Sequence, residues 1–200
     1  LKFTFPLIGG FDGVNILDEE KSKISDIAAR REMDDSNQGG KDGPTVAAYR
    51  KAVDLMEAKQ DVDVQLLAIP GLRHPAVTDY AIEATERRFD ALFIIDIEEK
   101  DEVDAYITGS VQVPSVTNTI NRFSGRALDT SFAAAYYPDI VIADPATRTN
   151  VKAPASAVVL GAFALNDAVG FPWFAPAGFT RGGLASAIYP GVELLQQNRD

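Results

Sequence analysis

Apolar residues in this chain follow two alternating patterns, short continuous runs and longer stretches with helical spacing. The runs at 62–70 and 91–97 resemble strands covered on both faces, because they are apolar through much of their length. Between them, and before them at 46–59, apolar positions recur every three or four residues, which predicts amphipathic helices. The predicted strands are 3–8, 62–70, 91–97 and 133–142, and the predicted helices are 46–59, 75–89, 111–123, 154–168 and the start of another at 192–198.

Strands alternating with helices at this spacing predict βαβ units. We therefore expect an α/β fold with a mainly parallel sheet and helices on both faces, a three-layer arrangement. Pro138 interrupts the last predicted strand and indicates an edge, a bulge or a bend, whereas Pro114 fits the first turn of its helix. Thr45 is the expected N-cap of the first helix.

Two hundred residues suit a single domain, so we expect one α/β domain over 1–200. The charged stretch 18–44 is predicted to be a loop-rich excursion from it. The sequence opens within a strand-like run and stops within a helix-like one, from which we expect a fragment of a longer protein.

The segment 154–181 combines an apolar helix with an aromatic loop. Its first part is almost entirely small and apolar, which predicts a buried helix. Trp173, the only tryptophan, then stands between Pro172 and Pro176, where a helix cannot continue because proline removes a backbone donor and restricts the preceding residue. We expect a rigid loop that is buried or forms a subunit interface; a further hypothesis is that Trp173 stacks on a sugar.

Charge narrows the classes of partner. The net charge is −10, which disfavours nucleic acid and anionic membrane surfaces and favours a basic partner if a charged one exists. There is no cysteine, which excludes thiol catalysis, disulfides and cysteine-ligated metals. No apolar run reaches membrane-spanning length.

Residues for catalysis are few. His74 is the only histidine and would have to serve any Ser-His-Asp site, with Ser110, Ser156 or Ser186 and an aspartate such as Asp12. None of these serines lies in a G-x-S-x-G turn, and His74 is expected in an exposed loop. The glycine-rich turn 9–13 lacks the lysine of a phosphate-binding loop and is interpreted as structural.

An acidic cluster follows the second core strand. Ligand sites form at the carboxyl ends of such strands, and carboxylates could hold Mg²⁺ or Ca²⁺. The spacing does not match a calcium-binding loop, so the favoured interpretation is a solvated acidic loop. The cluster runs from Asp96 to Asp104 and comprises Asp96, Glu98, Glu99, Asp101, Glu102 and Asp104.

Several stretches together resemble the contractile tail sheath proteins of bacteriophages and related particles. The strongest is W-F-A-P-A-G at 173–178 with Arg181 and Gly182, preceded by G-A-F-A-L-N-D at 161–167. The other matching stretches are A-A-Y-Y-P-D at 134–139 with D-P at 144–145, L-I-G-G-F-D-G at 7–13, and V-D-V-Q-L at 62–66. Each is short, but their order and spacing agree with the family over most of the chain.

The resemblance implies a structural protein rather than an enzyme, with no catalytic, cofactor or metal residues. Subunits of this family stack as six-fold rings around a tail tube and contract to drive it through the host envelope. Their core domain has a subtilisin-like topology without a protease site. The implied partners are copies of the chain itself, the tube protein, and baseplate and terminator proteins, in a phage tail assembled in the host cytoplasm. The residues implied to be structural or at interfaces are Asp12, Trp173, Pro176, Gly178 and Arg181.

Two hypotheses therefore stand beside each other. The first is a sheath subunit with no active site. The second is an α/β hydrolase or ligand-binding enzyme using His74 or the acidic cluster, which would need a pocket that brings His74 together with a serine and an aspartate.

Overall fold

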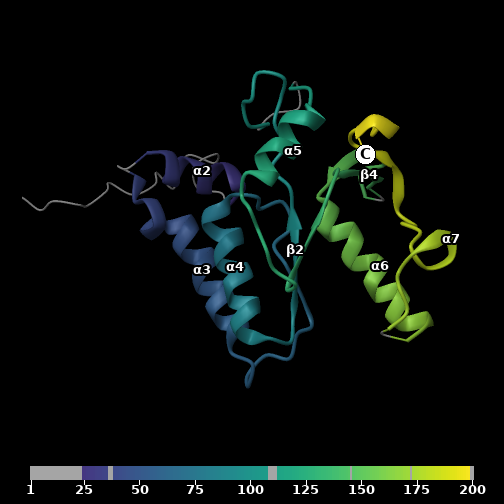
Figure 1. The fold of residues 1–200 in the computed structure, drawn as a ribbon, viewed down its shortest axis with the longest axis horizontal. Helices are drawn as coiled ribbons and strands as arrows, with labels where there is room; N and C mark the ends of the chain where they lie inside the picture. The colour runs from purple at the N-terminus through teal and green to yellow at the C-terminus, as the bar shows by residue number, and fades with distance from the viewer. Residues whose placement is uncertain (1–23, 36–37, 108–111, 145, 172, 199–200) are drawn as a thin grey trace, which may run out of the picture.

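A computed structural model describes residues 24–35, 38–107, 112–144, 146–171 and 173–198, which form a mixed α/β fold with two three-stranded sheets (Figure 1). The helices are α2 (Asp26–Asp34), α3 (Pro44–Glu57), α4 (Pro75–Arg88), α5 (Val116–Ser124), α6 (Ala155–Val169) and α7 (Gly178–Arg181), with short 3-10 turns η2 (Gly40–Asp42) and η3 (Gln196–Asn198). The strands are β1 (Leu66–Ala68), β2 (Leu92–Asp96), β3 (Ala133–Tyr136), β4 (Ile140–Ala143), β5 (Asn150–Ala153) and β6 (Ala187–Pro190).

The first sheet is parallel, in the order β1-β2-β3, and α4 makes the crossover from β1 to β2. Phe93 and Ile95 of β2 enter a core with residues of α3 and α4 such as Val53 and Ala81. Because side chains alternate along a strand, Asp96 faces the opposite way, where it bonds to Ser156 of α6. Figure 1 accordingly shows α3 and α4 on one side of β2 and α6 on the other. The predicted parallel βαβ core is confirmed.

The second sheet is antiparallel, in the order β5-β4-β6. The prediction of one strand over 133–142 is wrong. The chain leaves β3, passes a cis Tyr137–Pro138 peptide and enters β4, which belongs to this second sheet. Of the options that Pro138 indicated, the bend is therefore the one observed. The sheet is small and exposed, with Val141 as its one buried hydrophobic residue among those the structure describes.

Helix α3 is capped by a side chain from a distant position. Its N-cap is Gly43 with Pro44 in the first turn, not Thr45 as predicted. The buried Glu32 carboxylate of α2 accepts the backbone N–H groups of Thr45 (2.9 Å) and Val46 (2.9 Å). A Cβ at position 43 would overlap Oε2 of Glu32, so a larger residue there would displace the carboxylate from its capping position. Helix α2 itself lies within 18–44, which was expected to be loop-rich.

Helix α4 matches its predicted bounds, with one difference on its outer face. Helical spacing places Arg88 on the outer face with Glu83, Glu86 and Arg87, yet Arg88 is buried. Its guanidinium donates to the carbonyl oxygens of Met56 (2.5 Å) and Val62 (2.6 Å) and pairs with Asp90. Met56 lies in the last turn of α3, and Val62 lies just after that helix. Their carbonyl oxygens give the buried guanidinium hydrogen-bond partners, although the helical spacing of α4 predicts that Arg88 faces solvent.

Helix α6 was predicted to be buried, and this prediction is wrong. Its bounds agree with the predicted helix, but it is not buried: only Ala155, Ser156 and Asn166 are buried among its residues. An apolar sequence shows that a helix can be covered, not that this chain covers it. The other predicted helices are shorter than expected, since α5 begins at Val116 after an N-cap at Ser115 and the stretch 192–198 holds only η3.

Candidate functional site

Asp96, the last residue of β2, fixes α6 to the parallel sheet. Its carboxylate accepts hydrogen bonds from the backbone N–H of Ser156 (2.8 Å), the hydroxyl of Ser156 (2.6 Å) and the backbone N–H of Gly71 (3.0 Å). Asp96 and Ser156 are both buried. A carboxylate at the first turn of a helix satisfies N–H groups that have no partner within the helix. Asp96 therefore serves as a structural cap.

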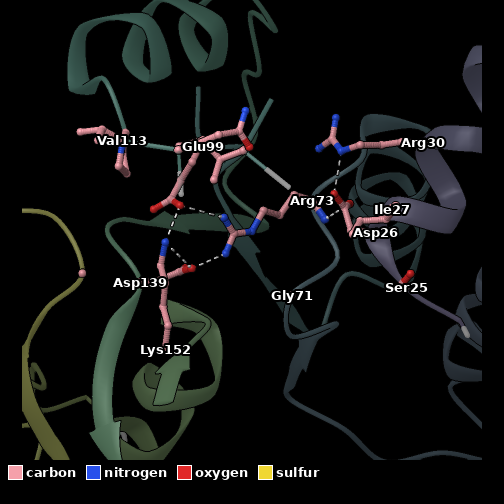
Figure 2. Close-up of a pocket in the computed structure, with 14 residues that line it drawn as sticks. Ser25, Asp26, Ile27, Arg30, Gly71, Arg73, Glu99, Val113, Asp139 and Lys152 are labelled. Atoms are coloured by element: carbon pink, nitrogen blue, oxygen red, sulfur yellow. Dashed lines mark hydrogen bonds and ion pairs between the residues drawn. The ribbon is translucent and has the colours of Figure 1, made fainter. Parts of the chain in front are cut away.

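The next two carboxylates lie in a network of ion pairs, which we call the charged cluster and which Figure 2 shows in part. Glu98 pairs with Arg30 of α2 (2.6 Å) and Arg122 of α5 (3.4 Å). Glu99 pairs with Lys152 of β5 (2.6 Å) and lies 3.7 Å from Arg73. The full charged cluster is Asp26, Arg30, Arg73, Glu98, Glu99, Arg122, Asp139 and Lys152.

Arg73 is at the centre of the charged cluster in Figure 2, between Glu99 and Asp139. Its guanidinium donates to Asp139, 2.5 Å away, and its backbone N–H donates to Asp26 of α2 (2.8 Å). Burial by itself would lower the pKa of Arg73, but the Asp139 and Glu99 carboxylates outweigh it and raise that pKa. Arg73 therefore stays charged and links α2, the end of β2 and the start of β4.

A pocket of about 720 Å³ opens beside the charged cluster. It is lined by charged groups of both signs, including Arg30, Arg73 and Lys152, and by apolar side chains such as Ile27 and Val113. Most of the charges are already paired within the protein. Oxygen Oε1 of the Glu99 carboxylate is buried and has no hydrogen-bond partner among the residues that the structure describes.

Nearby, burial and the negative charge of Glu99 raise the pKa of Tyr137 to about 12. The phenol therefore stays protonated at neutral pH, and a hydrogen bond with Thr119 limits the rise of its pKa.

The acidic cluster was expected to be a solvated loop, and this is wrong for its first half. Asp96, Glu98 and Glu99 are buried, because backbone groups and cations from distant segments surround them, whereas Glu102 and Asp104 are exposed as expected. Within the described residues, no group of three or more histidine, aspartate or glutamate side chains is arranged to hold a metal ion.

His74 is a helix cap in this structure. Its Nδ1 accepts the backbone N–H of Ala76 (3.1 Å) at the start of α4, and its own backbone N–H donates to Asp26 (2.8 Å). Burial, together with the positive charge of Arg30, lowers the pKa of His74. The serines do not join it: the Ser156 hydroxyl bonds to Asp96, Ser186 is exposed, and Ser110 and Asp12 lie outside the described residues.

The aromatic loop after α6 is an ordered group of rings. Phe171 stacks on Trp173 with ring centroids 4.8 Å apart, and Phe174 meets Phe171 edge-on at 5.5 Å. Asn166, near the end of α6, donates to the carbonyl of Phe174 (2.8 Å), and the Arg181 guanidinium lies 4.8 Å from the Phe174 ring. The predicted rigid aromatic loop thus has direct contacts that hold its shape.

The loop is exposed, which excludes the buried alternative and leaves the subunit interface as a prediction. Trp173 is 74% exposed, Phe171 54% and Phe174 39%, and Phe179 of α7 is fully exposed. Of the other residues singled out from the sequence, Pro176 is half-buried, Gly178 starts α7 with φ of 75°, and Pro172 lies outside the described residues. We call Leu165, Val169, Phe171, Trp173, Phe174 and Phe179, all exposed, the aromatic patch.

Sequence reasoning did not identify the ion pairs of the charged cluster. Arg73, Lys152 and Asp139 come from a loop, an exposed strand and the connection between β3 and β4, and nothing in their local sequence distinguishes them from surface charges. The sequence could have predicted burial for Asp96 alone. It directly follows a continuous apolar run, which places its carboxylate at the buried end of a strand.

Comparisons with known proteins add no relative: no protein-family model matches the sequence, and no curated protein matches it. Among the described helices, none combines the length and apolar character needed to cross a membrane.

Proposed function

We propose that this chain is a structural subunit of a contractile phage tail sheath, with no enzymatic activity. In this proposal it assembles with copies of itself in six-fold rings around a tail tube, and it meets the tube, baseplate and terminator proteins of the virion. The ordered set of motifs in the sequence is its starting point. The fold is compatible with it, since a parallel sheet between helices is the layered arrangement that a subtilisin-like core would have.

The observation that carries the proposal is the aromatic patch. An aromatic side chain can bury about 150–250 Å², so the four rings, scaled by their exposed fractions, offer roughly 400–700 Å². This area lies within or above the range for the largest apolar patch of a typical monomer, about 300–600 Å², and approaches the roughly 800 Å² that each partner contributes to a standard interface. The rings of Phe171, Trp173 and Phe174 already contact one another, so they would lose little side-chain entropy on association. A patch of this size and order suits a protein whose role is contact with other subunits.

The arrangement of the polar residues supports the same proposal. His74 is engaged in capping α4 and the Ser156 hydroxyl in bonding to Asp96, so neither is free to act as base or nucleophile. The carboxylates of the charged cluster are held by cations. Their contacts join separate segments of the fold, which is a structural use of charge.

Electron microscopy of the protein expressed from its complete gene tests the proposal. We expect striated hollow cylinders or stacked rings, because sheath subunits polymerise with six-fold symmetry. A protein that stays monomeric under all salt, pH and crowding conditions, with or without a co-expressed tube protein, would count against it.

A carbohydrate-binding module is the second candidate, because the indole of Trp173 is exposed. One face of the indole is stacked on Phe171, and a sugar would have to use the other. Titration of the intrinsic tryptophan fluorescence with oligosaccharides separates the two candidates, since saturable quenching favours the module and no change favours the sheath subunit.

A further inference from the structure

The antiparallel sheet has little apolar attachment to the rest of the fold. Among the described residues of β4, β5 and β6, Val141 is the one that is buried and hydrophobic, while Val151, Ile188 and Tyr189 are about half exposed. A sheet this exposed gains little hydrophobic free energy from packing. Something else has to hold it against the parallel sheet.

Two cations and two carboxylates form that attachment. Arg73, from the loop after β1, pairs with Asp139 at the entrance to β4 (2.5 Å) and lies 3.7 Å from Glu99. Lys152 of β5 pairs with Glu99 at the end of β2 (2.6 Å) and with Asp139 (3.5 Å). In the described part of the chain, these are the side-chain bonds that join the antiparallel sheet and its flanking Asp139 to the parallel sheet and its loops.

The burial of three of these four groups makes their contribution large, whereas the Lys152 side chain is 41% exposed. Glu99 and Asp139 are buried, and the Arg73 side chain is nearly so. Ion pairs on a surface contribute little, whereas removing one partner from a buried pair leaves an uncompensated charge away from water. Covalent continuity adds three further links among the described residues: the Tyr137–Pro138 connection from β3, the passage from β5 through Pro154 into α6, and the segment that leads from α7 into β6.

We propose that Arg73, Glu99, Asp139 and Lys152 form an ionic latch, and that the antiparallel sheet opens from the parallel sheet as a unit when the latch is broken. The opened state retains the α3–α4–β2 core, which is closed by apolar contacts that do not involve the latch. This inference concerns the fold itself and does not depend on the proposed sheath function. Local opening of such a unit needs less free energy than global unfolding.

Native-state hydrogen exchange on the whole chain tests the latch. In Arg73→Met we expect the amides of β4 and β5 to exchange on the order of a hundredfold faster, because a buried charge pair is broken. The amides of β1 and β2 should keep their protection. Arg87→Met is the matched control, since it removes an arginine paired with Glu57 on the exposed surface of α3 and α4; it should leave β4 and β5 unchanged.

A milder variant keeps the test decisive if Arg73→Met does not fold. Lys152→Met keeps the aliphatic stem of a partly exposed side chain, and we expect the same amides of β4 and β5 to exchange about tenfold faster. Equal acceleration in both sheets would overturn the latch, because it would mean that the cluster supports the fold globally. Unchanged exchange in β4 and β5 would overturn it as well.

Discussion

Replacing Asp96 with alanine tests the central junction between β2 and α6. In the folded protein this carboxylate accepts three hydrogen bonds, from the backbone and hydroxyl of Ser156 and from the backbone of Gly71. Alanine removes the acceptor and leaves those donors in place. Ser156 is fully buried, so water cannot replace the lost partner there, whereas Gly71 is only half-buried and can be solvated.

The size of the effect follows from the two bonds to Ser156, because water can replace the bond to Gly71. A hydrogen bond to a charged group contributes about 1.5–3 kcal/mol, so the two bonds to Ser156 together contribute about 3–6 kcal/mol. We therefore expect Asp96→Ala to lower the free energy of unfolding by that amount, a large part of the stability of a typical domain. Asp96→Asn keeps one acceptor oxygen and nearly the same volume, and it should lose about half as much.

Urea unfolding followed by circular dichroism measures this loss. Glu86→Ala, which removes an exposed carboxylate from α4, is the control and should change the free energy of unfolding by less than about 0.5 kcal/mol. A loss below about 1 kcal/mol in Asp96→Ala would refute the reasoning, since it would show that the Ser156 donors find other partners. Equal losses in the alanine and asparagine variants would also contradict it.

Three further predictions concern other contacts. Trp173→Ala should cost the isolated chain less than about 2 kcal/mol, well below the 3–5 kcal/mol of a buried ring, yet prevent assembly in micrographs; full assembly by the variant would contradict an interface role. Glu32→Ala should lose about 2 kcal/mol in urea unfolding, because Thr45 and Val46 at the start of α3 lose their acceptor, and Glu32→Gln should lose less. The wild type should lose stability as pH falls below the ordinary His74 pKa of 6.5, because the unfolded chain binds the proton that the folded state disfavours. His74→Asn, which keeps a capping side chain, should flatten this dependence between pH 7.5 and 5.5; an identical pH slope in both proteins would refute it.

The parts of the fold that the sequence predicts well are those governed by local pattern. Helix α4 and strand β2 agree with their predicted ranges to within a residue or two, because apolar spacing and flanking proline or glycine residues act over a few positions. The buried Arg88 shows the limit of the same reasoning. Helical spacing places it on the outer face, but two carbonyl oxygens from the end of α3 make its burial favourable.

In the candidate sites too, local sequence predicts some features, and others depend on residues far away in the chain. Proline and aromatic residues around Trp173 predict a stiff loop from chemistry within a few residues, and the stacking of Phe171 on Trp173 agrees with this. Whether the loop is covered depends on what lies opposite α6, which no local pattern encodes. Of the two predicted alternatives for this loop, burial within the chain is therefore excluded, and a subunit interface stays a prediction.

By itself, the sequence determines the parallel βαβ core, the helix that ends in an aromatic loop, and the shortage of groups for catalysis. Only the tertiary structure decides that the chain divides into two sheets, that Glu98 and Glu99 are buried rather than solvated, and that Trp173 is exposed. The physical reason is the range of the interactions. Backbone conformation and apolar spacing act between near neighbours, whereas a charge such as Arg73 acquires its role from carboxylates at distant positions that folding alone brings within a few ångströms.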